Sequence, residues 1–297
     1  MGTAAPRAVF VTRESDYELL IARHATREQA RFFLETRGQK LAEMEARHER
    51  FQAVLRQARS QVPGDWRQTS VRRGDLDRFL FGPDDLIVVV GQDGLVANVA
   101  KYLSGQPVLG VNPLPDLYDG ILVRAPLNRL AATLPATVNR DAEIEARTMA
   151  EAVLDNGETL LALNEIFVGH RSHQSARYSV SIGSASEEQS SSGVIAATGT
   201  GATGWARSIM QATGAQIPLS PDEPAIAFFV REPFPSVATG TSIRAGKLSA
   251  EPLRITSRMN DGGVIFADGI EQDFLGFGWG RRVEVKAAAR SLRLVRG

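Results

Sequence analysis

An unbroken apolar run at residues 86–90 ends in a glycine, a polar residue, an acid and a second glycine, which are Gly91, Gln92, Asp93 and Gly94. The run is short and rich in β-branched residues, a pattern typical of a strand buried on both faces. After Gly94 the apolar residues recur at three- and four-residue spacing, which predicts a helix. Residues 91–94 are therefore predicted to form a turn between a buried strand and the start of a helix.

The same alternation of apolar runs and helical spacing extends through the first part of the chain. Further strands are predicted at residues 8–11, 68–71 and 107–111, and helices from residue 27, over 41–58 and over 75–79. Strands that alternate with helices predict a parallel sheet with right-handed crossovers. Ligands of such sheets bind beyond the carboxyl ends of the strands, where Asp93 and Asn112 would both lie.

The pattern changes after about residue 125, where helical spacing becomes rare. Apolar segments at residues 144–154 and 160–168 flank Asp155, Asn156 and Gly157, a sequence that favours a hairpin turn. Further strands are predicted at residues 178–182, 193–197, 225–230, 253–258, 264–267, 283–287 and 292–295. This second part of the chain is therefore predicted to be rich in β-structure.

Two other segments complete the prediction. Residues 205–212 have convincing helical spacing, and residues 187–192 are polar and rich in serine, which predicts an exposed loop. We therefore expect two domains, an α/β domain with a mostly parallel sheet at residues 1–125 and a β-rich domain at residues 126–297.

The composition is that of an ordinary globular enzyme. Of the 297 residues, 43% are apolar and 23% are charged, and the formal net charge is zero. This balance gives no reason to expect nucleic acid or a membrane as a partner, and no apolar run approaches the roughly 18 residues of a membrane span. The absence of cysteine excludes disulfides and thiolate nucleophiles. The absence of cysteine also makes a cytoplasmic location the expectation.

The predicted turn at residues 91–94 has the chemistry of an anion site. Its glycines let the backbone approach a ligand closely, and the N–H groups at a helix start favour phosphate. An acid beside a phosphate site is electrostatically costly, so Asp93 is interpreted as a general base, a metal ligand or an acceptor for a ribose hydroxyl. The alternative is an ordinary strand–turn–helix connection in which Asp93 caps the helix.

Asn164 and Glu165 form a polar pair inside the otherwise apolar segment at residues 160–168. Burying both side chains costs several kcal/mol, roughly, unless they find partners. The base and the ribose hydroxyls of a nucleotide would be suitable partners. The alternative is a bulge or a sheet edge at which both side chains are hydrated.

A second glycine-rich segment follows a predicted strand and precedes the predicted helix at residues 205–212. It alternates threonine and glycine, and it contains Thr198, Gly199, Thr200, Gly201, Ala202, Thr203 and Gly204. Hydroxyl and backbone N–H donors at a helix start can cradle a phosphate or a ribose, whereas the alternative is a flexible surface loop. His170 and His173 have the spacing of metal ligands but lack further ligands nearby, so no metal site is predicted.

No Ser-His-Asp set is indicated, and no Walker-type phosphate loop occurs. A lone acid in a glycine turn, together with two nucleotide-like segments, favours phosphoryl transfer. In this hypothesis Asp93 accepts a proton from a substrate hydroxyl, while backbone amides and Mg²⁺ carry the charge of the phosphates.

The order of these motifs resembles the ATP-NAD kinase family, whose superfamily also contains diacylglycerol, sphingosine and phosphofructo-type kinases. The resemblance covers about residues 80–270 and is strongest to the divergent branch that includes the mitochondrial-type NAD kinase. That branch likewise has Asn-Glu followed by a glycine, then Ser-Ser-Gly, and Thr-Gly-Thr-Gly before a tryptophan. The motifs are the Asp93 turn, Gly110-Val111-Asn112, Leu163-Asn164-Glu165, residues 198–205 and Asp268-Gly269.

The resemblance implies an α/β domain followed by a β-sandwich domain, with the active site between them. It implies phosphoryl transfer from ATP or another donor to the adenosine ribose 2′-hydroxyl of NAD, with Mg²⁺, in a homodimer or homotetramer. Asp93 would activate the hydroxyl, and Asn164 and Glu165 would hold the NAD adenine and ribose. The remaining nucleotide-binding residues implied are Gly91, Gln92, Gly94, Asn112, Thr198, Thr200, Gly201, Ala202 and Thr203.

The chain departs from the family pattern at Gln92, where the family has a second glycine. A glutamine there would obstruct the site if the backbone needed a positive φ or if a phosphate touched the main chain. This departure motivates an alternative function, a nucleotide-binding pseudoenzyme that binds the dinucleotide without turnover. A lipid or sugar kinase of the same superfamily is a further alternative.

Overall fold

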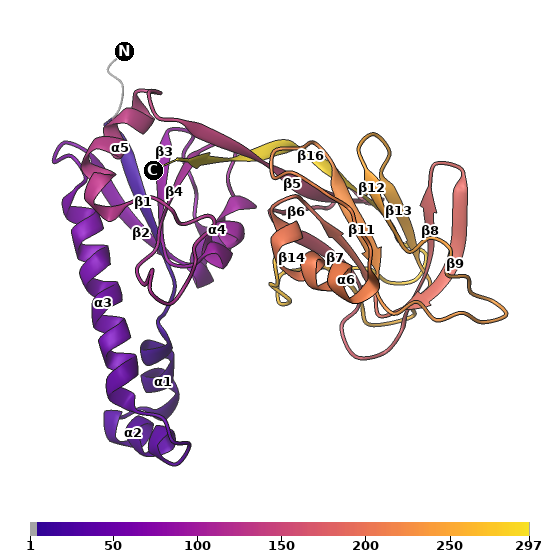
Figure 1. Cartoon of the computed structure of the whole chain (residues 1–297), viewed down its shortest axis with the longest axis horizontal. Coiled ribbons are helices and arrows are strands. Elements are labelled where there is room, and N and C mark those ends of the chain that lie inside the picture. Colours follow the sequence, from indigo (N-terminus) through magenta and orange to yellow (C-terminus); the bar gives the residue numbers. More distant parts are fainter. Residues whose placement is uncertain (1–4, 297) are drawn as a thin grey trace. The chain divides into compact units, whose positions relative to one another are not determined.

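The computed structural model describes residues 5–296 and divides the chain into two compact units. The first unit comprises two segments, the chain up to Glu145 and the chain from Arg293 onward. The second unit comprises Ala146–Leu292 (Figure 1). Two strands, β5 (Ile144–Leu154) and β16 (Arg282–Val295), run from one unit into the other. A mostly parallel α/β sheet in the first unit and a separate antiparallel sheet in the second confirm the predicted fold class.

The sheet of the first unit has the strand order β2-β1-β3-β4, followed by the end of β16, and all its pairs are parallel. The strands are β1 (Arg7–Thr12), β2 (Arg67–Arg72), β3 (Asp85–Val90) and β4 (Pro107–Val111). All six residues of β3 are buried. The strand predicted at residues 86–90 therefore lies in the middle of the sheet, where both faces are covered.

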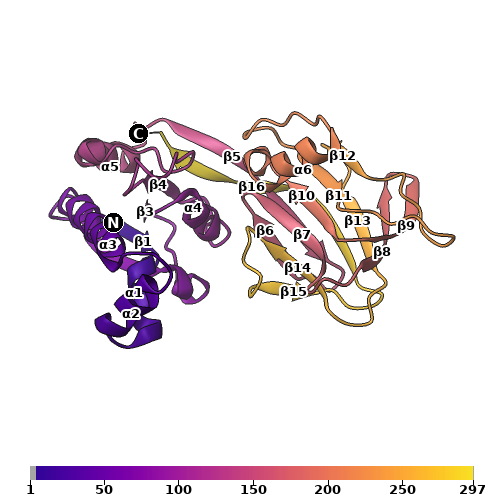
Figure 2. The same ribbon diagram turned by 60° about the horizontal axis from the view of Figure 1, so that its bottom comes forward.

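Helices cover both faces of this sheet, with α3 and α5 on one side and α4 on the other (Figure 2). Alternate side chains such as Phe10, Leu86 and Leu109 pack with Leu130 and Leu134 of α5. The helices are α1 (Asp16–His24), α2 (Arg27–Glu35), α3 (Leu41–Ser60), α4 (Asp93–Ala100) and α5 (Leu130–Val138), with short 3₁₀ turns η1 (Arg73–Arg78) and η2 (Leu127–Arg129).

Two of these helices were not predicted from the spacing of apolar residues. Helix α1 begins with a capping box, in which Ser15 accepts the Glu18 N–H and the Glu18 carboxylate accepts the Ser15 N–H. Helix α5 contains Pro135 and lies after residue 125, where β-structure was expected. It packs against the parallel sheet, so the first unit extends beyond residue 125.

The second unit consists of two sheets that bury one apolar core between them. One sheet has the order β12-β11-β10-β7-β14-β15, and the other contains β16, β13, β8 and β9 together with β5 and β6. Side chains from both sheets share one cluster, in which Ile166 and Phe228 meet Tyr178 and Ile255. This packing is that of a β-sandwich. Helix α6 (Trp205–Thr213) covers the outer face of the sheet that contains β7, β10, β11 and β14.

The strands of the second unit include the predicted hairpin, in which β5 and β6 pair antiparallel and Gly157 has φ 86°. They are β6 (Thr159–Ala162), β7 (Glu165–His170), β8 (Ala176–Ile182), β9 (Ala185–Ser191), β10 (Val194–Ala197), β11 (Ile226–Val230), β12 (Ala245–Leu248), β13 (Leu253–Ser257), β14 (Gly263–Ala267) and β15 (Phe274–Gly276). The loop predicted at residues 187–192 is wrong, because most of it forms β9 and pairs with β8.

The single strand predicted at residues 160–168 is also wrong. It is broken after Ala162, so that β6 pairs with β5 in one sheet, whereas β7 pairs with β10 and β14 in the other. Leu163 and Asn164 occupy the break. Within residues 5–296, no helix has both the length and the apolar character needed to cross a membrane.

Candidate functional site

The turn at residues 91–94 joins β3 to α4 as predicted. Gln92 precedes the first helical residue, Asp93, and has φ −99° and ψ 168°. This is extended backbone that any residue can adopt, so glutamine at this position causes no strain. Gly91 is buried, and a Cβ there would lie 2.9 Å from a terminal methyl of Leu95. Among residues 5–296, no atom outside the adjoining residues and the backbone of α4 lies within 4 Å of the Cβ position at Gly94. The first turn of the helix therefore has open space beside it.

The Asp93 carboxylate accepts two hydrogen bonds from the loop that contains Ile121 and Leu122. One oxygen accepts the Ile121 N–H and the other accepts the Leu122 N–H, each at 2.7 Å. The interpretation of Asp93 as a helix cap is therefore wrong, because its side chain bonds outside the helix. Each oxygen keeps lone pairs that can accept a substrate hydroxyl, and the two backbone donors hold the group in one orientation.

The loop reaches Asp93 because Gly110 lets it approach β4. A Cβ on Gly110 would lie 2.3 Å from the Leu122 carbonyl oxygen and 2.7 Å from Val123 Cα. The Ala125 N–H also donates to the Gly110 carbonyl at 2.8 Å. The close contact between these two segments therefore sets where the Asp93 carboxylate points.

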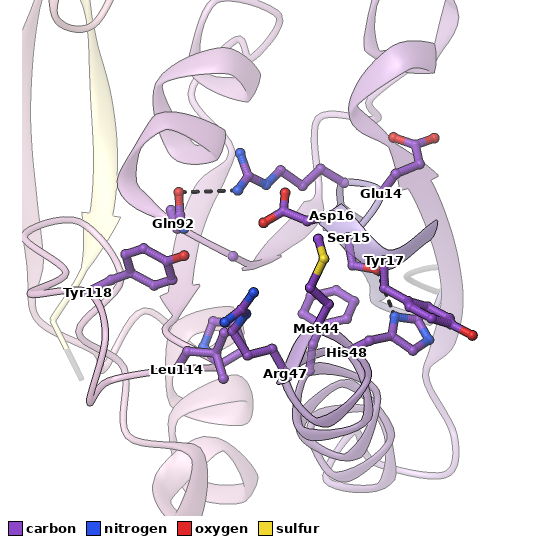
Figure 3. Close-up of a pocket in the computed structure, with 14 residues that line it drawn as sticks. Glu14, Ser15, Asp16, Tyr17, Met44, Arg47, His48, Gln92, Leu114 and Tyr118 are labelled. Atoms are coloured by element: carbon purple, nitrogen blue, oxygen red, sulfur yellow. Dashed lines mark hydrogen bonds between the residues drawn. The ribbon is translucent and has the colours of Figure 1, made fainter. Parts of the chain in front are cut away.

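A pocket of about 570 Å³, open solvent included, lies beside this turn within the first unit (Figure 3). It is bounded by the residue after β1, the start of α1, one face of α3, the turn and the segment after β4. Its lining residues are Arg13, Glu14, Ser15, Asp16, Tyr17, Met44, Arg47, His48, Phe51, Gly91, Gln92, Pro113, Leu114 and Tyr118. This is the edge at which open α/β sheets bind ligands.

Asn112 organises the segment after β4 rather than lining the pocket. Its amide nitrogen donates to the Tyr118 carbonyl at 2.7 Å, and its amide oxygen accepts the Leu114 N–H at 3.0 Å. These bonds shape the loop that contributes Leu114 and Tyr118 to the pocket. Arg13 and Arg47 were not predicted as site residues; the signal for Arg13 is its place directly after a buried strand.

A second candidate site surrounds the break between β6 and β7 in the second unit. The Asp268 carboxylate accepts the N–H groups of Leu163, Asn164 and Glu165 at 2.9, 2.7 and 3.3 Å. Asp268 itself has φ 51°, an uncommon backbone conformation for a residue other than glycine. The acid of the Asp268-Gly269 motif therefore satisfies the backbone donors that the strand break leaves without sheet partners.

The threonine–glycine segment packs on the same break. Thr198 donates its hydroxyl to the Leu163 carbonyl at 2.5 Å and its N–H to the Asn164 carbonyl at 2.9 Å. A Cβ on Gly201 would lie 2.1 Å from the Asn164 carbonyl oxygen. Three motifs that are far apart in the sequence are thus brought together within the second unit.

The members of this segment differ in exposure. Thr198 and Thr200 are buried, and the Thr200 hydroxyl accepts a bond from Arg147 at 3.3 Å. Gly201 is buried as well, whereas Ala202 is half-buried and Thr203 is exposed. Of the predicted nucleotide-binding positions in the segment, Ala202 and Thr203 are therefore the ones that a ligand can reach most directly.

The carboxyl group of Glu165 has a perturbed pKa. Burial, and then the negative charge of Asp268, raise the pKa of Glu165 from 4.5 to about 7. The side chain is half-buried, and no residue within 5–296 donates a hydrogen bond to its carboxyl group. A carboxyl group in this state can donate or accept a hydrogen bond near neutral pH.

Metal ligands do not cluster within residues 5–296, where no group of three or more histidine, aspartate and glutamate side chains could hold an ion. His170 instead accepts the Ser172 N–H at its Nδ1 atom, at 3.1 Å.

No protein-family model matches the chain. A probable NADH kinase from Oryza sativa subsp. japonica is 29% identical over 229 residues, which cover 69% of this chain and 68% of that protein. NAD kinases from Chlorobaculum tepidum and Cupriavidus pinatubonensis are 28% and 31% identical over 130 and 133 residues. Each of these matches covers 42% of this chain, and they span only 44% and 42% of the respective relatives.

Two solved structures are similar along nearly the whole chain. An NAD kinase from Archaeoglobus fulgidus, solved in complex with ATP, has a TM-score of 0.59 and 18% identity, and the match covers 98% of this chain and 93% of that one. Yeast NADH kinase, complexed with NADH, has a TM-score of 0.59 and 17% identity, with coverage of 99% and 84%.

The chain has the fold of the NAD kinases. Together with the sequence matches, this confirms the predicted resemblance to that family.

Proposed function

We propose that the chain is an NAD kinase, which transfers a phosphoryl group from ATP or another donor to the 2′-hydroxyl of the adenosine ribose of NAD. The observation that carries this proposal is the Asp93 carboxylate. It is held by the Ile121 and Leu122 N–H groups directly after a buried strand, beside a pocket and the open space at Gly94. The names of the sequence relatives and the ligands of the similar structures agree with it.

In the proposed reaction the ribose 2′-oxygen forms a bond to the terminal phosphorus of the donor. The bond from that phosphorus to the bridging oxygen breaks, so ATP would leave ADP, and Asp93 accepts the hydroxyl proton. The first-turn N–H groups of α4 and the open face of Gly94 suit a phosphate oxygen. Mg²⁺ would arrive with the donor phosphates and neutralise part of their charge.

The acceptor side of the proposal rests on the second unit. Asn164 offers an amide to the adenine edge, and Glu165 offers a carboxyl group to the ribose hydroxyls. Because the pKa of Glu165 is raised to about 7, its hydrogen-bonding role toward the ribose would change within the physiological range. Ala202 and Thr203 would contact the dinucleotide at the surface of their segment.

The proposal also includes an oligomeric state and a cellular location. The resemblance supports a homodimer or homotetramer, which light scattering after size-exclusion chromatography would test. It also supports a cytoplasmic enzyme that acts on small nucleotides, without nucleic acid or membrane partners.

The test is NADP formation by the purified protein with NAD, ATP and Mg²⁺, measured with an NADP-specific dehydrogenase. We expect Asp93→Asn to lower kcat by about 10²- to 10⁴-fold, because the variant cannot accept the proton. Asp84→Asn is a matched control, because Asp84 is an exposed acid at the other end of β3. Undiminished turnover in Asp93→Asn would refute the assigned base. NAD binding without NADP formation would favour the pseudoenzyme, and absence of both would reject the function.

A further inference from the structure

Arg13 is a half-buried cation that lines the first-unit pocket. It follows β1 directly, and its Nη2 atom donates to the Gln92 side-chain oxygen at 3.3 Å (Figure 3). None of the carboxylates within residues 5–296 lies close enough to form an ion pair with it. Arg13 is therefore held beside the turn by a neutral side chain, and it forms no ion pair with the described residues.

Arg47 brings a second cation to the same pocket from one face of α3 (Figure 3). It is half-buried, and the described part of the chain provides it with no ion-pair partner. The acids that face the pocket are Glu14 and Asp16. Glu14 lies 3.5 Å from Arg72, and Asp16 is exposed. Partly desolvated guanidinium groups without a carboxylate partner favour an anionic ligand.

Gln92 explains why Arg13 points toward the turn. The extended backbone at Gln92 carries a side chain without strain, and its amide oxygen is the one hydrogen-bond acceptor that the described residues offer to Arg13. A glycine at this position would provide no such acceptor, and the Arg13 side chain would regain rotamer freedom. Gln92, which replaces the second glycine of the family pattern, thus provides a hydrogen-bond acceptor for Arg13.

We propose that Arg13 and Arg47 bind the phosphate groups of the phosphoryl donor, and that Gln92 is a positioning residue that holds Arg13 in place. This inference rests on the proposed function, since it assigns the pocket to the donor. The planar guanidinium group matches phosphate oxygens in a bidentate manner. The assignment to the donor follows from the position of the pocket against Gly91 and Gln92, whereas the residues proposed for the acceptor lie in the second unit.

The test compares Arg13→Ala, Arg47→Ala, Gln92→Gly and the double variant Arg13→Ala/Gln92→Gly with Arg56→Ala. Arg56 is an exposed arginine on α3 outside the pocket, so its replacement controls for the loss of one positive charge. The readouts are the KM for ATP, the KM for NAD, and calorimetric binding of inorganic triphosphate to the intact protein. Circular dichroism confirms that each variant is folded.

We expect Arg13→Ala and Arg47→Ala each to raise the KM for ATP by about 10- to 100-fold and to weaken triphosphate binding similarly, with the KM for NAD unchanged. Arg13→Lys should recover part of the loss. Gln92→Gly should raise the KM for ATP by about 3- to 10-fold in the parent protein, because one hydrogen bond that orients Arg13 is lost. It should have no further effect in Arg13→Ala, because its contribution passes through Arg13.

The outcomes separate this inference from the proposed function. Suppose that the parent protein forms NADP, but that Arg13→Ala and Arg47→Ala change neither the KM for ATP nor triphosphate binding. This result would overturn the inference and leave the proposed kinase function standing. Additive effects of Arg13→Ala and Gln92→Gly would overturn the positioning role of Gln92. Triphosphate binding that depends on Arg13, in a protein that forms no NADP, would support the phosphate site and overturn the kinase function.

Discussion

Replacing Glu165 with glutamine should stabilise the protein in a strongly pH-dependent way. The folded protein raises the pKa of Glu165 to about 7 from 4.5, through burial and through the charge of Asp268. Glutamine has nearly the same shape and remains neutral at every pH. The parent protein at low pH has a neutral carboxyl group at this position as well, so the two proteins should differ least there and most at high pH.

The magnitude follows from the shift in pKa. The folded state holds the Glu165 proton more tightly than the unfolded state does. The contribution of protonated Glu165 to stability is therefore fully present below about pH 4.5 and is lost as the pH rises through about 7. A change from 4.5 to about 7 corresponds to roughly 3 kcal/mol, at about 1.4 kcal/mol per pH unit. Between pH 5 and pH 8 the stability of Glu165→Gln relative to the parent should therefore increase by roughly 2 to 3 kcal/mol.

The assay is urea unfolding of both proteins at pH 5, 6, 7 and 8, with the difference in free energy of unfolding plotted against pH. Glu251→Gln, at an exposed glutamate of the second unit, controls for the loss of one negative charge. Carbon-13 NMR of labelled glutamate carboxyl groups measures the pKa of Glu165 directly. An equal stability difference at pH 5 and pH 8 would refute the reasoning.

Other substitutions test how the two candidate sites are built. Gly110→Ala should destabilise the protein by about 1 to 3 kcal/mol and lower NADP formation, because its Cβ would meet backbone atoms of the loop that holds Asp93; unchanged urea unfolding would contradict this. Gly94→Ala should leave stability equal or raise it by up to about 1 kcal/mol, since nothing lies within 4 Å, but should raise the KM for ATP; an unchanged KM would argue against phosphate contact there. Asp268→Asn should cost about 1 to 3 kcal/mol of stability and lower the pKa of Glu165 in the NMR titration, because it removes an N–H acceptor and a nearby charge.

The local patterns of the sequence were sufficient for the first unit's sheet and for the turn at residues 91–94. A buried β-branched run, a pair of glycines and helical spacing depend on neighbouring residues, so the chain near Asp93 reveals them directly. Helix α1 shows the limit of apolar spacing, because its signal was the capping box at Ser15 and Glu18. The edge strand β9 was missed because its sequence is polar throughout, even at Gln189 and Ser191, which are buried, so that no apolar alternation marks it.

Contacts between segments far apart in the sequence determine the hydrogen-bond partners of the two acidic motifs. Asp93 bonds to backbone groups 28 and 29 residues away, and Asp268 bonds to groups 103 to 105 residues away. The break between β6 and β7 depends on that second contact, so the sequence around Asn164 read as one continuous strand.

The motifs, the fold class and the resemblance to the NAD kinases could be predicted from the sequence, because each is encoded in short stretches of neighbouring residues. The pairing of Arg13 with Gln92, the orientation of the Asp93 carboxylate and the raised pKa of Glu165 could not. Each depends on burial and on hydrogen bonds between segments that approach one another only when the chain is folded, and no local pattern specifies those distances.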